Sequence, residues 1–114
     1  DIDKKTFINS DRIKSYYVNQ NDQISIKDMW DKINKINFDI IIDDGHHTIE
    51  TGVMFFKNSF DRLKKNGQYI IEDVHIAYLD KLVEKLKEYN PKIILFENNN
   101  NLDDNNLVVL KKND

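Results

Sequence analysis

Two pairs of neighbouring carboxylates are the residues of this chain best suited to chemistry. Asp43-Asp44 and Glu72-Asp73 each end an apolar run, and each precedes a segment with helical spacing of its apolar residues. In an open parallel sheet, ligands bind beyond the carboxyl ends of the strands. We therefore expect the four carboxylates to converge at one end of a sheet.

Three histidines accompany the two acidic pairs: His46 and His47 follow the first, and His75 follows the second. Like charges at close range raise each other's pKa unless a cation or a proton intervenes. Mg²⁺ suits an all-oxygen ligand set, and a nearby histidine could act as a general base. A structural explanation is about equally supported, because Asp-Gly is a common turn pair and the helix dipole favours acids at a helix start. One of His46 and His47 could equally cap a helix or pack.

The elements that would position these side chains alternate between strands and helices. Period-2 and continuous apolar runs predict strands at Ile13–Val18, Phe38–Ile42, Tyr69–Ile71, Ile93–Phe96 and Leu107–Leu110. Helical spacing predicts helices at Ile26–Ile36, from the N-cap Thr48 to Asn66-Gly67, and at Leu79–Tyr89 before Pro91.

This alternation predicts an α/β fold with a Rossmann-like, doubly wound and mostly parallel sheet. The nearly continuous apolar run at Phe38–Ile42 is typical of a strand that is buried on both faces. The last two strands are joined by a loop alone, with an Asn-rich run at 98–101, which permits an antiparallel strand at the sheet edge.

Composition narrows the class of protein. A chain of 114 residues supports one small domain, and its net charge of −3, with interspersed signs, does not favour nucleic acid as a partner. The absence of cysteine excludes disulfides, thiolate metal sites and a cysteine nucleophile. No apolar run reaches membrane-spanning length and no signal peptide is visible, so we expect no membrane partner and a cytoplasmic location.

Residues 38–47 (FDIIIDDGHH) and 66–73 (NGQYIIED) resemble class I S-adenosylmethionine-dependent methyltransferases. The nearest branch is the metal-dependent sugar O-methyltransferases of macrolide biosynthesis, together with the proteins labelled cephalosporin hydroxylase. Their pattern is a strand ending Asp-Asp-Gly-Ser-His, a helix, a Pro-Gly-Gly-like turn and a strand ending Glu-Asp. The resemblance covers nearly the whole chain, although His46 replaces the usual Ser and Asn66-Gly67 replaces the fuller turn.

The resemblance assigns roles to the acidic pairs. It implies that Asp44, Glu72 and Asp73 ligate Mg²⁺ and that His47 is the general base. This base would take a proton from a sugar hydroxyl as the hydroxyl attacks the methyl group of the sulfonium cofactor.

The resemblance also implies a binding site for S-adenosylmethionine. Asp1 and Asp3 correspond to the end of the second strand, where an acid holds the cofactor ribose. Asp22, in segment 20–23, would accept a hydrogen bond from the exocyclic amine of the adenine. We group Asp43, the carboxylate left over from the metal set, with these cofactor-binding residues.

The first strand of this fold and its glycine-rich loop have no counterpart, since the chain has three glycines and none begins such a loop. We therefore expect residues 1–114 to be the C-terminal portion of a single, truncated methyltransferase-like domain, with a gap in its sheet.

Three functions remain open. The first is an S-adenosylmethionine-dependent, Mg²⁺-assisted O-methyltransferase domain acting on a hydroxyl of a sugar or a similar small molecule. The second is a non-catalytic methyltransferase-like module within a larger protein or a homo-oligomer. The third is a metal-dependent hydrolase that uses the same carboxylates without a cofactor pocket.

Overall fold

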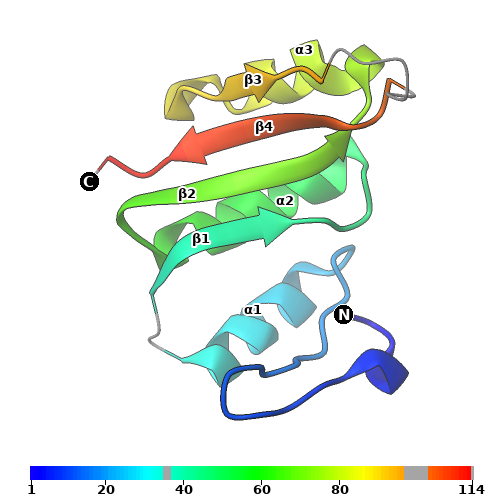
Figure 1. Ribbon diagram of the computed structural model, residues 1–114, viewed down its shortest axis with the longest axis vertical. Helices are drawn as coiled ribbons and strands as arrows, with labels where there is room; N and C mark the ends of the chain where they lie inside the picture. Colours follow the sequence, from blue (N-terminus) through cyan, green and yellow to red (C-terminus); the bar gives the residue numbers. More distant parts are fainter. Residues whose placement is uncertain (35–36, 97–102, 114) are drawn as a thin grey trace.

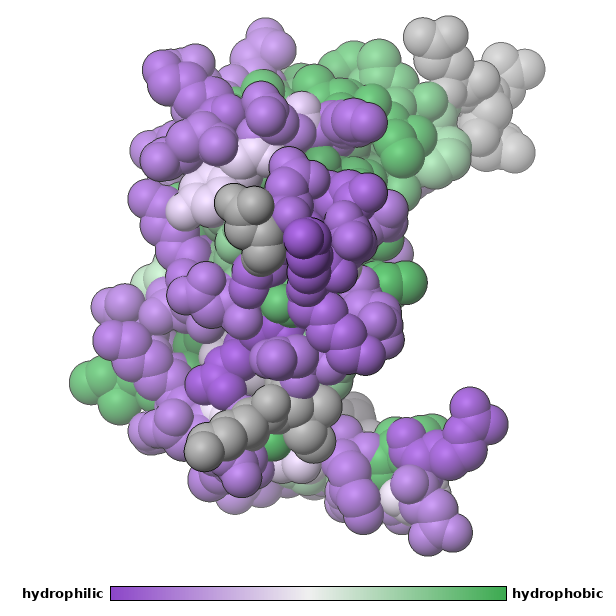
Figure 2. All heavy atoms as spheres, turned by 90° about the vertical axis from the view of Figure 1, so that its left-hand side faces the viewer, coloured by the Kyte–Doolittle hydropathy of each residue, from purple (hydrophilic) through white to green (hydrophobic). Residues whose placement is uncertain are grey.

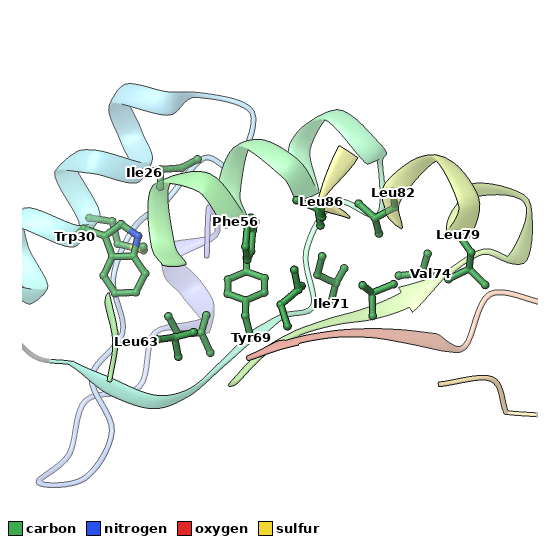
Figure 3. Packing of buried hydrophobic residues seen from close by; sticks show 14 residues of the cluster. Ile26, Trp30, Phe56, Leu63, Tyr69, Ile71, Val74, Leu79, Leu82 and Leu86 are labelled. Carbon is green, nitrogen blue, oxygen red and sulfur yellow. The ribbon is translucent and has the colours of Figure 1, made fainter. Parts of the chain in front are cut away.

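A mixed sheet organises the computed structural model, which describes residues 1–34, 37–96 and 103–113. The strands are β1 (Phe38–Asp43), β2 (Leu63–Val74), β3 (Lys92–Ile94) and β4 (Asn106–Lys111). They pair in the order β1-β2-β4-β3, with β1 parallel to β2 and β4 antiparallel to both of its neighbours. The helices α1 (Gln23–Ile33), α2 (Ile49–Ser59) and α3 (Ile76–Lys85) lie on one face of the sheet (Figures 1 and 3). Short 3₁₀ helices occupy Lys4–Thr6, Phe60–Arg62 and Lys87–Tyr89.

The predicted α/β class with an antiparallel strand is confirmed, with one difference in its position. The antiparallel strand β4 lies one place in from the edge, because it pairs with β2 on one side and with β3 on the other. The last two strands form the predicted antiparallel pair, and β3 is the edge strand.

The prediction that the Phe38–Ile42 run is buried on both faces is wrong. Ile41 packs beneath the helices, whereas Ile40 and Ile42 point to the other face and are 55% and 54% exposed. Among the described residues, no helix covers that second face. The four strands form a continuous sheet, and β1 is an edge where a gap was expected.

The strand predicted at Ile13–Val18 is also wrong, because this segment lies outside the sheet. A strand needs a continuous hydrogen-bonded partner. Here isolated backbone hydrogen bonds take the place of a ladder: Asp1 N donates to Tyr16 O at 3.0 Å, Val18 N donates to Asp1 O at 3.0 Å, and Ser10 N donates to Ile13 O at 2.7 Å. The segment therefore runs beside the chain start as an extended strap that leads into α1.

The helix ends follow local chemistry. Asp22 Oδ1 accepts from Ile24 N at 2.9 Å, so α1 begins earlier than predicted. Thr48 caps α2 as predicted, but α2 ends at Ser59 instead of Asn66-Gly67. Leu63 is buried as the first residue of β2, and its spacing also fits the apolar stripe of α2. The spacing alone therefore could not show that the helix ends before it. The predicted helix end at Ile36 and the loop at 98–101 lie outside the described residues.

Aromatic rings link the helices to the sheet. Phe56 of α2 is fully buried and meets the ring of Tyr69 edge-on, with centroids 5.0 Å apart. The ring of Tyr89 meets Phe56 in the same manner at 4.9 Å. Trp30 of α1 donates its indole N–H to Ser59 Oγ at 2.9 Å, which joins α1 to α2. Figure 3 shows Trp30, Phe56 and Tyr69 among the buried side chains that lie between the helices and the strands.

The side of the molecule opposite the carboxyl ends of β1 and β2 is mostly hydrophilic. Figure 2 views the molecule from the side at which β1 and β2 begin, and polar residues cover most of this face with smaller apolar areas between them. No helix in the described parts of the chain combines the length and the apolar character that crossing a bilayer requires.

Replacing Phe56 by Ala should lower the free energy of unfolding by about 3–5 kcal/mol, because the substitution leaves a cavity among three aromatic rings. Urea denaturation followed by circular dichroism would measure the change. The matched control is Ile24→Ala on α1, where the side chain is 71% exposed, and its effect should stay within about 0.5 kcal/mol. Equal losses in the two variants would contradict this placement of the core.

Candidate active site

The two acidic pairs meet at one edge of the sheet. β1 and β2 are parallel neighbours with Asp43 opposite Ile71, so their carboxyl ends lie side by side (Figure 1). Asp44, His47 and Asp73 each present one ligand atom, and these atoms all lie within 4.8 Å of one another. All three residues are exposed to solvent. Two carboxylates and an imidazole at this spacing could hold a divalent cation.

A β-bulge turns Asp73 toward this cluster. The register between β2 and β4 shifts between Ile71 and Val74, and Asp73 has a φ of 52°, in the left-handed region. Such a φ is uncommon outside glycine, although Asp and Asn tolerate it best, and bulges often redirect a side chain next to a functional site. The buried side chain of Asn106 donates from Nδ2 to Val74 O at 3.1 Å, which anchors the bulge to β4.

The turn after β1 is held by Gln20, which lies between the N-terminal strap and α1. Gln20 Oε1 accepts from the backbone N–H of His46 at 3.0 Å. Thr48 N donates to His46 O, and the Thr48 side chain then caps α2. A Cβ atom on Gly45 would lie 1.8 Å from Gln20 Oε1, so only glycine at this position leaves room for the Gln20 side chain.

Asp43 is buried, unlike the three exposed residues of the cluster. It is 5% exposed, and its Oδ1 accepts from Gln20 Nε2 at 2.6 Å while its Oδ2 accepts from the Tyr69 hydroxyl at 3.4 Å. Burial raises the pKa of Asp43 above its ordinary value, against the opposing effect of these two hydrogen bonds and of His47. Burial, followed by the charge of Asp43, holds the pKa of Tyr69 well above its ordinary value.

The remaining residues of the predicted metal and base set lie near the cluster but outside it. Glu72 is half-buried and lines the same small pocket as Asp73 and His47, but the ligand atoms that converge do not include its carboxylate. His46 is exposed and lines a different cleft. His75 Nδ1 accepts from Ala77 N at 3.0 Å and caps α3, which is a structural role.

A cleft of about 600 Å³ separates the N-terminal strap from the end of β1. Of the four acids predicted on the cofactor side, Asp1 and Asp43 line this cleft. Asp3 and Asp22 lie outside it and cap helices, since Asp3 accepts from Lys5 N and Asp22 accepts from Ile24 N. The residues that line the cleft include Asp1, Asn19, Gln20, Asp43, Gly45 and His46.

Sequence reasoning did not identify three residues that support the site: Gln20, Tyr69 and Asn106. Each is a polar residue whose partner is distant along the chain, so no local spacing links the two. Tyr69 lies within an apolar strand, where its hydroxyl is the one hint of a buried polar partner.

Asp43→Asn should change how stability depends on pH. A raised folded-state pKa means that the native protein binds this proton more tightly, so wild-type stability falls as pH rises from the ordinary value of 3.8 through the raised value. The amide variant lacks this loss. The free energy of unfolding of the variant minus that of the wild type should therefore increase with pH across this window, as measured by urea denaturation with a chelator present. A difference that stays constant or decreases would contradict the burial of this carboxylate.

No protein-family model matches the chain. Over 78 residues, the chain is 36% identical to the 8-demethyl-8-alpha-L-rhamnosyl tetracenomycin-C 2'-O-methyltransferase of Streptomyces olivaceus. Over 78 residues it is also 33% identical to the demethylmacrocin O-methyltransferase of Streptomyces fradiae. Each match covers 68% of this chain, but only 20% and 19% of the respective relative, so the chain spans about a fifth of the length of these relatives.

The fold is shared with solved methyltransferase structures. The MycE methyltransferase from the mycinamycin biosynthetic pathway, in complex with Mg and SAH, superposes with a TM-score of 0.67 at 23% identity. A second structure of MycE, with Mg, SAH and mycinamycin VI, gives 0.68 at 21% identity. Both cover 98% of this chain and 35% of the solved chain. The chain is therefore related in sequence to a part of these O-methyltransferases, and the resemblance predicted from its two acidic motifs is confirmed.

Proposed function

We propose that the protein transfers a methyl group from S-adenosylmethionine to a hydroxyl of a small molecule, with a sugar as the favoured acceptor and Mg²⁺ as the metal. The observation that carries this proposal is the convergence of Asp44, His47 and Asp73 at the ends of two parallel strands, beside a large cleft. The relatives support it, because one is named for a 2'-O-methyl transfer on a rhamnosyl compound and the solved ones contain Mg and SAH. A small-molecule acceptor agrees with the MycE structure that holds mycinamycin VI.

Asp44, Glu72 and Asp73 are the residues that would hold Mg²⁺. Carboxylate oxygens are the ligands this ion prefers, and exposed carboxylates leave coordination positions open to an acceptor. Two of the three already share a cluster, and Glu72 adjoins Asp73 along the chain. When bound, the cation lowers the pKa of a coordinated hydroxyl and fixes its direction.

His47 is the proposed general base. Its ring lies in the same cluster as the two carboxylates, where an acceptor hydroxyl would be bound. A ring nitrogen of His47 takes the hydroxyl proton while the oxygen forms a bond to the methyl carbon. S-adenosylmethionine, when bound, would supply the methyl group, and the electron pair of its carbon–sulfur bond would remain on the sulfur as a neutral thioether.

The cleft between the strap and β1 is the proposed cofactor site. Asp1 and Asp43 provide carboxylates at its wall, and Asn19 and Gln20 provide amide groups. Carboxylates accept from ribose hydroxyls, and amides can both donate to and accept from an adenine edge. The cleft therefore has donor and acceptor groups of the kind that the nucleoside part of S-adenosylmethionine needs.

A second assignment for His47 follows from the same cluster, in which the imidazole stands where a third ligand would. In this arrangement Asp44, His47 and Asp73 hold the metal, and Glu72 remains beside them. The two assignments differ in what a His47 variant does to metal affinity.

Asp44→Asn should weaken binding of Mn²⁺, used as a probe for Mg²⁺, by at least ~10-fold, because even partners outside the ligand set change metal affinity by about 10- to 100-fold. Isothermal titration calorimetry would measure it. Asp39→Asn is the matched control, since this exposed acid lies at the start of β1 and pairs with Lys64 at 3.0 Å. Equal affinities of wild type and Asp44→Asn would exclude Asp44 as a ligand.

His47→Gln should reduce methyl transfer by about 10²–10⁴-fold while leaving Mn²⁺ affinity intact, because a general base contributes rate and not metal binding. The assay follows labelled methyl groups from S-adenosylmethionine to a panel of sugars with the full-length protein. A large loss of Mn²⁺ affinity in this variant would favour His47 as a ligand. Binding of SAH with no transfer to any acceptor by the wild type would favour a non-catalytic module, and turnover without S-adenosylmethionine would favour a hydrolase.

A further inference from the structure

One side chain connects the cofactor cleft to the metal cluster. Gln20 Nε2 donates to Asp43 Oδ1 at 2.6 Å, and Gln20 Oε1 accepts from the backbone N–H of His46 at 3.0 Å. This orientation of the amide is the only one that satisfies both partners, because the carboxylate can only accept and the backbone N–H can only donate. Asp43 and His46 are the residues immediately before Asp44 and His47, respectively.

We infer that Gln20 is a positioning residue, which sets the separation of Asp44 and His47 and so the affinity of the metal cluster. This inference rests on the proposed function of that cluster. Both ends of the Gln20 amide are engaged by Asp43 Oδ1 and by the His46 backbone N–H, neither of which is a ligand atom of the cluster. Gln20 acts through the backbone of the turn, by holding one point at each end of the four residues from Asp43 to His46.

The backbone that carries Gln20 is held by hydrogen bonds that involve no residue of the metal cluster. Asn19 N donates to Ser25 Oγ at 2.8 Å, and Asp22 N donates to Asn19 O at 3.0 Å. Asp22 then caps α1, whose residues Ile26 and Trp30 are in the core. The Gln20 side chain thus extends from a segment that is hydrogen-bonded to α1, a helix packed in the core. Its two hydrogen bonds to the turn after β1 therefore hold that turn in a fixed position.

The turn is shaped to receive Gln20. Gly45 lies between the two residues that Gln20 binds, and a Cβ there would overlap the Gln20 amide, at 1.8 Å from Oε1 and 2.5 Å from Cδ. No unusual backbone conformation requires glycine here, because Gly45 does not have a positive φ. A larger residue at position 45 would displace the Gln20 amide from its two partners, so glycine is what permits this placement of Gln20.

The first test compares Gln20→Ala with Gln23→Ala. Gln23 is a neighbouring glutamine whose Nε2 donates a hydrogen bond to Asn58 Oδ1 of α2 at 3.2 Å. This hydrogen bond involves no residue of the site. Gln20→Ala should weaken Mn²⁺ binding by about 10- to 100-fold, the range for groups that orient metal ligands. Gln23→Ala should change it by less than about 2-fold, which corresponds to a surface substitution. Calorimetry gives both affinities, and circular dichroism confirms that each variant is folded.

A readout that needs no metal is the hydrogen exchange of the His46 amide, followed by NMR. This amide should exchange about 10-fold faster in Gln20→Ala than in wild type, because its side-chain acceptor is gone and local opening then controls exchange. A purely structural role would speed exchange across α1 and α2 as well. Unchanged exchange at His46 would overturn the inference.

Moving the negative charge from position 43 to position 20 provides the sharpest test. Gln20→Glu alone sets two carboxylates against each other, so this variant should lose Mn²⁺ affinity by about 10-fold or more. Asp43→Asn alone is the milder control, because the new amide can still present its oxygen to the Gln20 amide. In the double variant the amide at position 43 can donate to the carboxylate at position 20, which still accepts from His46 N–H, and the net charge is unchanged. The Mn²⁺ affinity of the double variant should return to within about 3-fold of wild type, a coupling that a double-mutant cycle measures.

The outcomes separate the inference from the proposed function. A double variant that binds Mn²⁺ no better than Gln20→Glu would overturn the positioning role of Gln20. A wild-type chain that binds no Mn²⁺ would overturn the proposed metal cluster. In that case the His46 exchange in Gln20→Ala still decides whether Gln20 holds the turn.

Discussion

The parallel pairing of β1 with β2 is the constraint on which the candidate site depends. In this pairing Asp43 lies opposite Ile71, so Asp44, which follows β1, and the Glu72-Asp73 pair, in the last residues of β2, lie at the same end of the sheet. Because successive side chains of a strand point to opposite faces, a slip of one residue would turn Tyr69 out of the core and Asp43 out of its buried position. The aromatic layer formed by Phe56 and Tyr69 makes such a slip unfavourable. Core packing on one face thus fixes where the carboxylates emerge.

At the carboxyl ends of β1 and β2, the site is built from two different features of the backbone. One is the turn after β1, in which a glycine gives room to a glutamine from a distant segment. The other is the bulge in β2, where Asp73 adopts a left-handed φ and Asn106 anchors the neighbouring backbone. The left-handed conformation of Asp73 costs about 1–3 kcal/mol and persists because its surroundings enforce it. The turn at Gly45 carries no such strain, because its φ is not positive.

The sequence was sufficient to predict what local patterns encode. The class of fold, the cap at Thr48 and the convergence of Asp44 with Asp73 follow from apolar runs and from where those runs end. Two errors arose where local patterns are ambiguous. Ile13–Val18 has strand-like residues but no ladder partner, and Leu63 fits the apolar stripe of a helix as well as the start of a strand. The partners of Asp43 were not predictable, because Gln20 and Tyr69 reach it from distant parts of the chain.

The hydrogen bond from the Trp30 indole to Ser59 also makes Trp30 an intrinsic fluorescent probe of the contact between α1 and α2. Trp30 is the single tryptophan of the chain, and it is buried where α1, α2 and β1 meet, with the Phe38 ring 5.8 Å away and the Arg62 guanidinium 5.5 Å from its ring. Its fluorescence therefore comes from one defined junction. If α1 detaches from the sheet while the helices remain formed, the emission shifts to the red although the far-ultraviolet dichroism is nearly unchanged. The optical signal thus distinguishes undocking of the N-terminal segment from loss of helix.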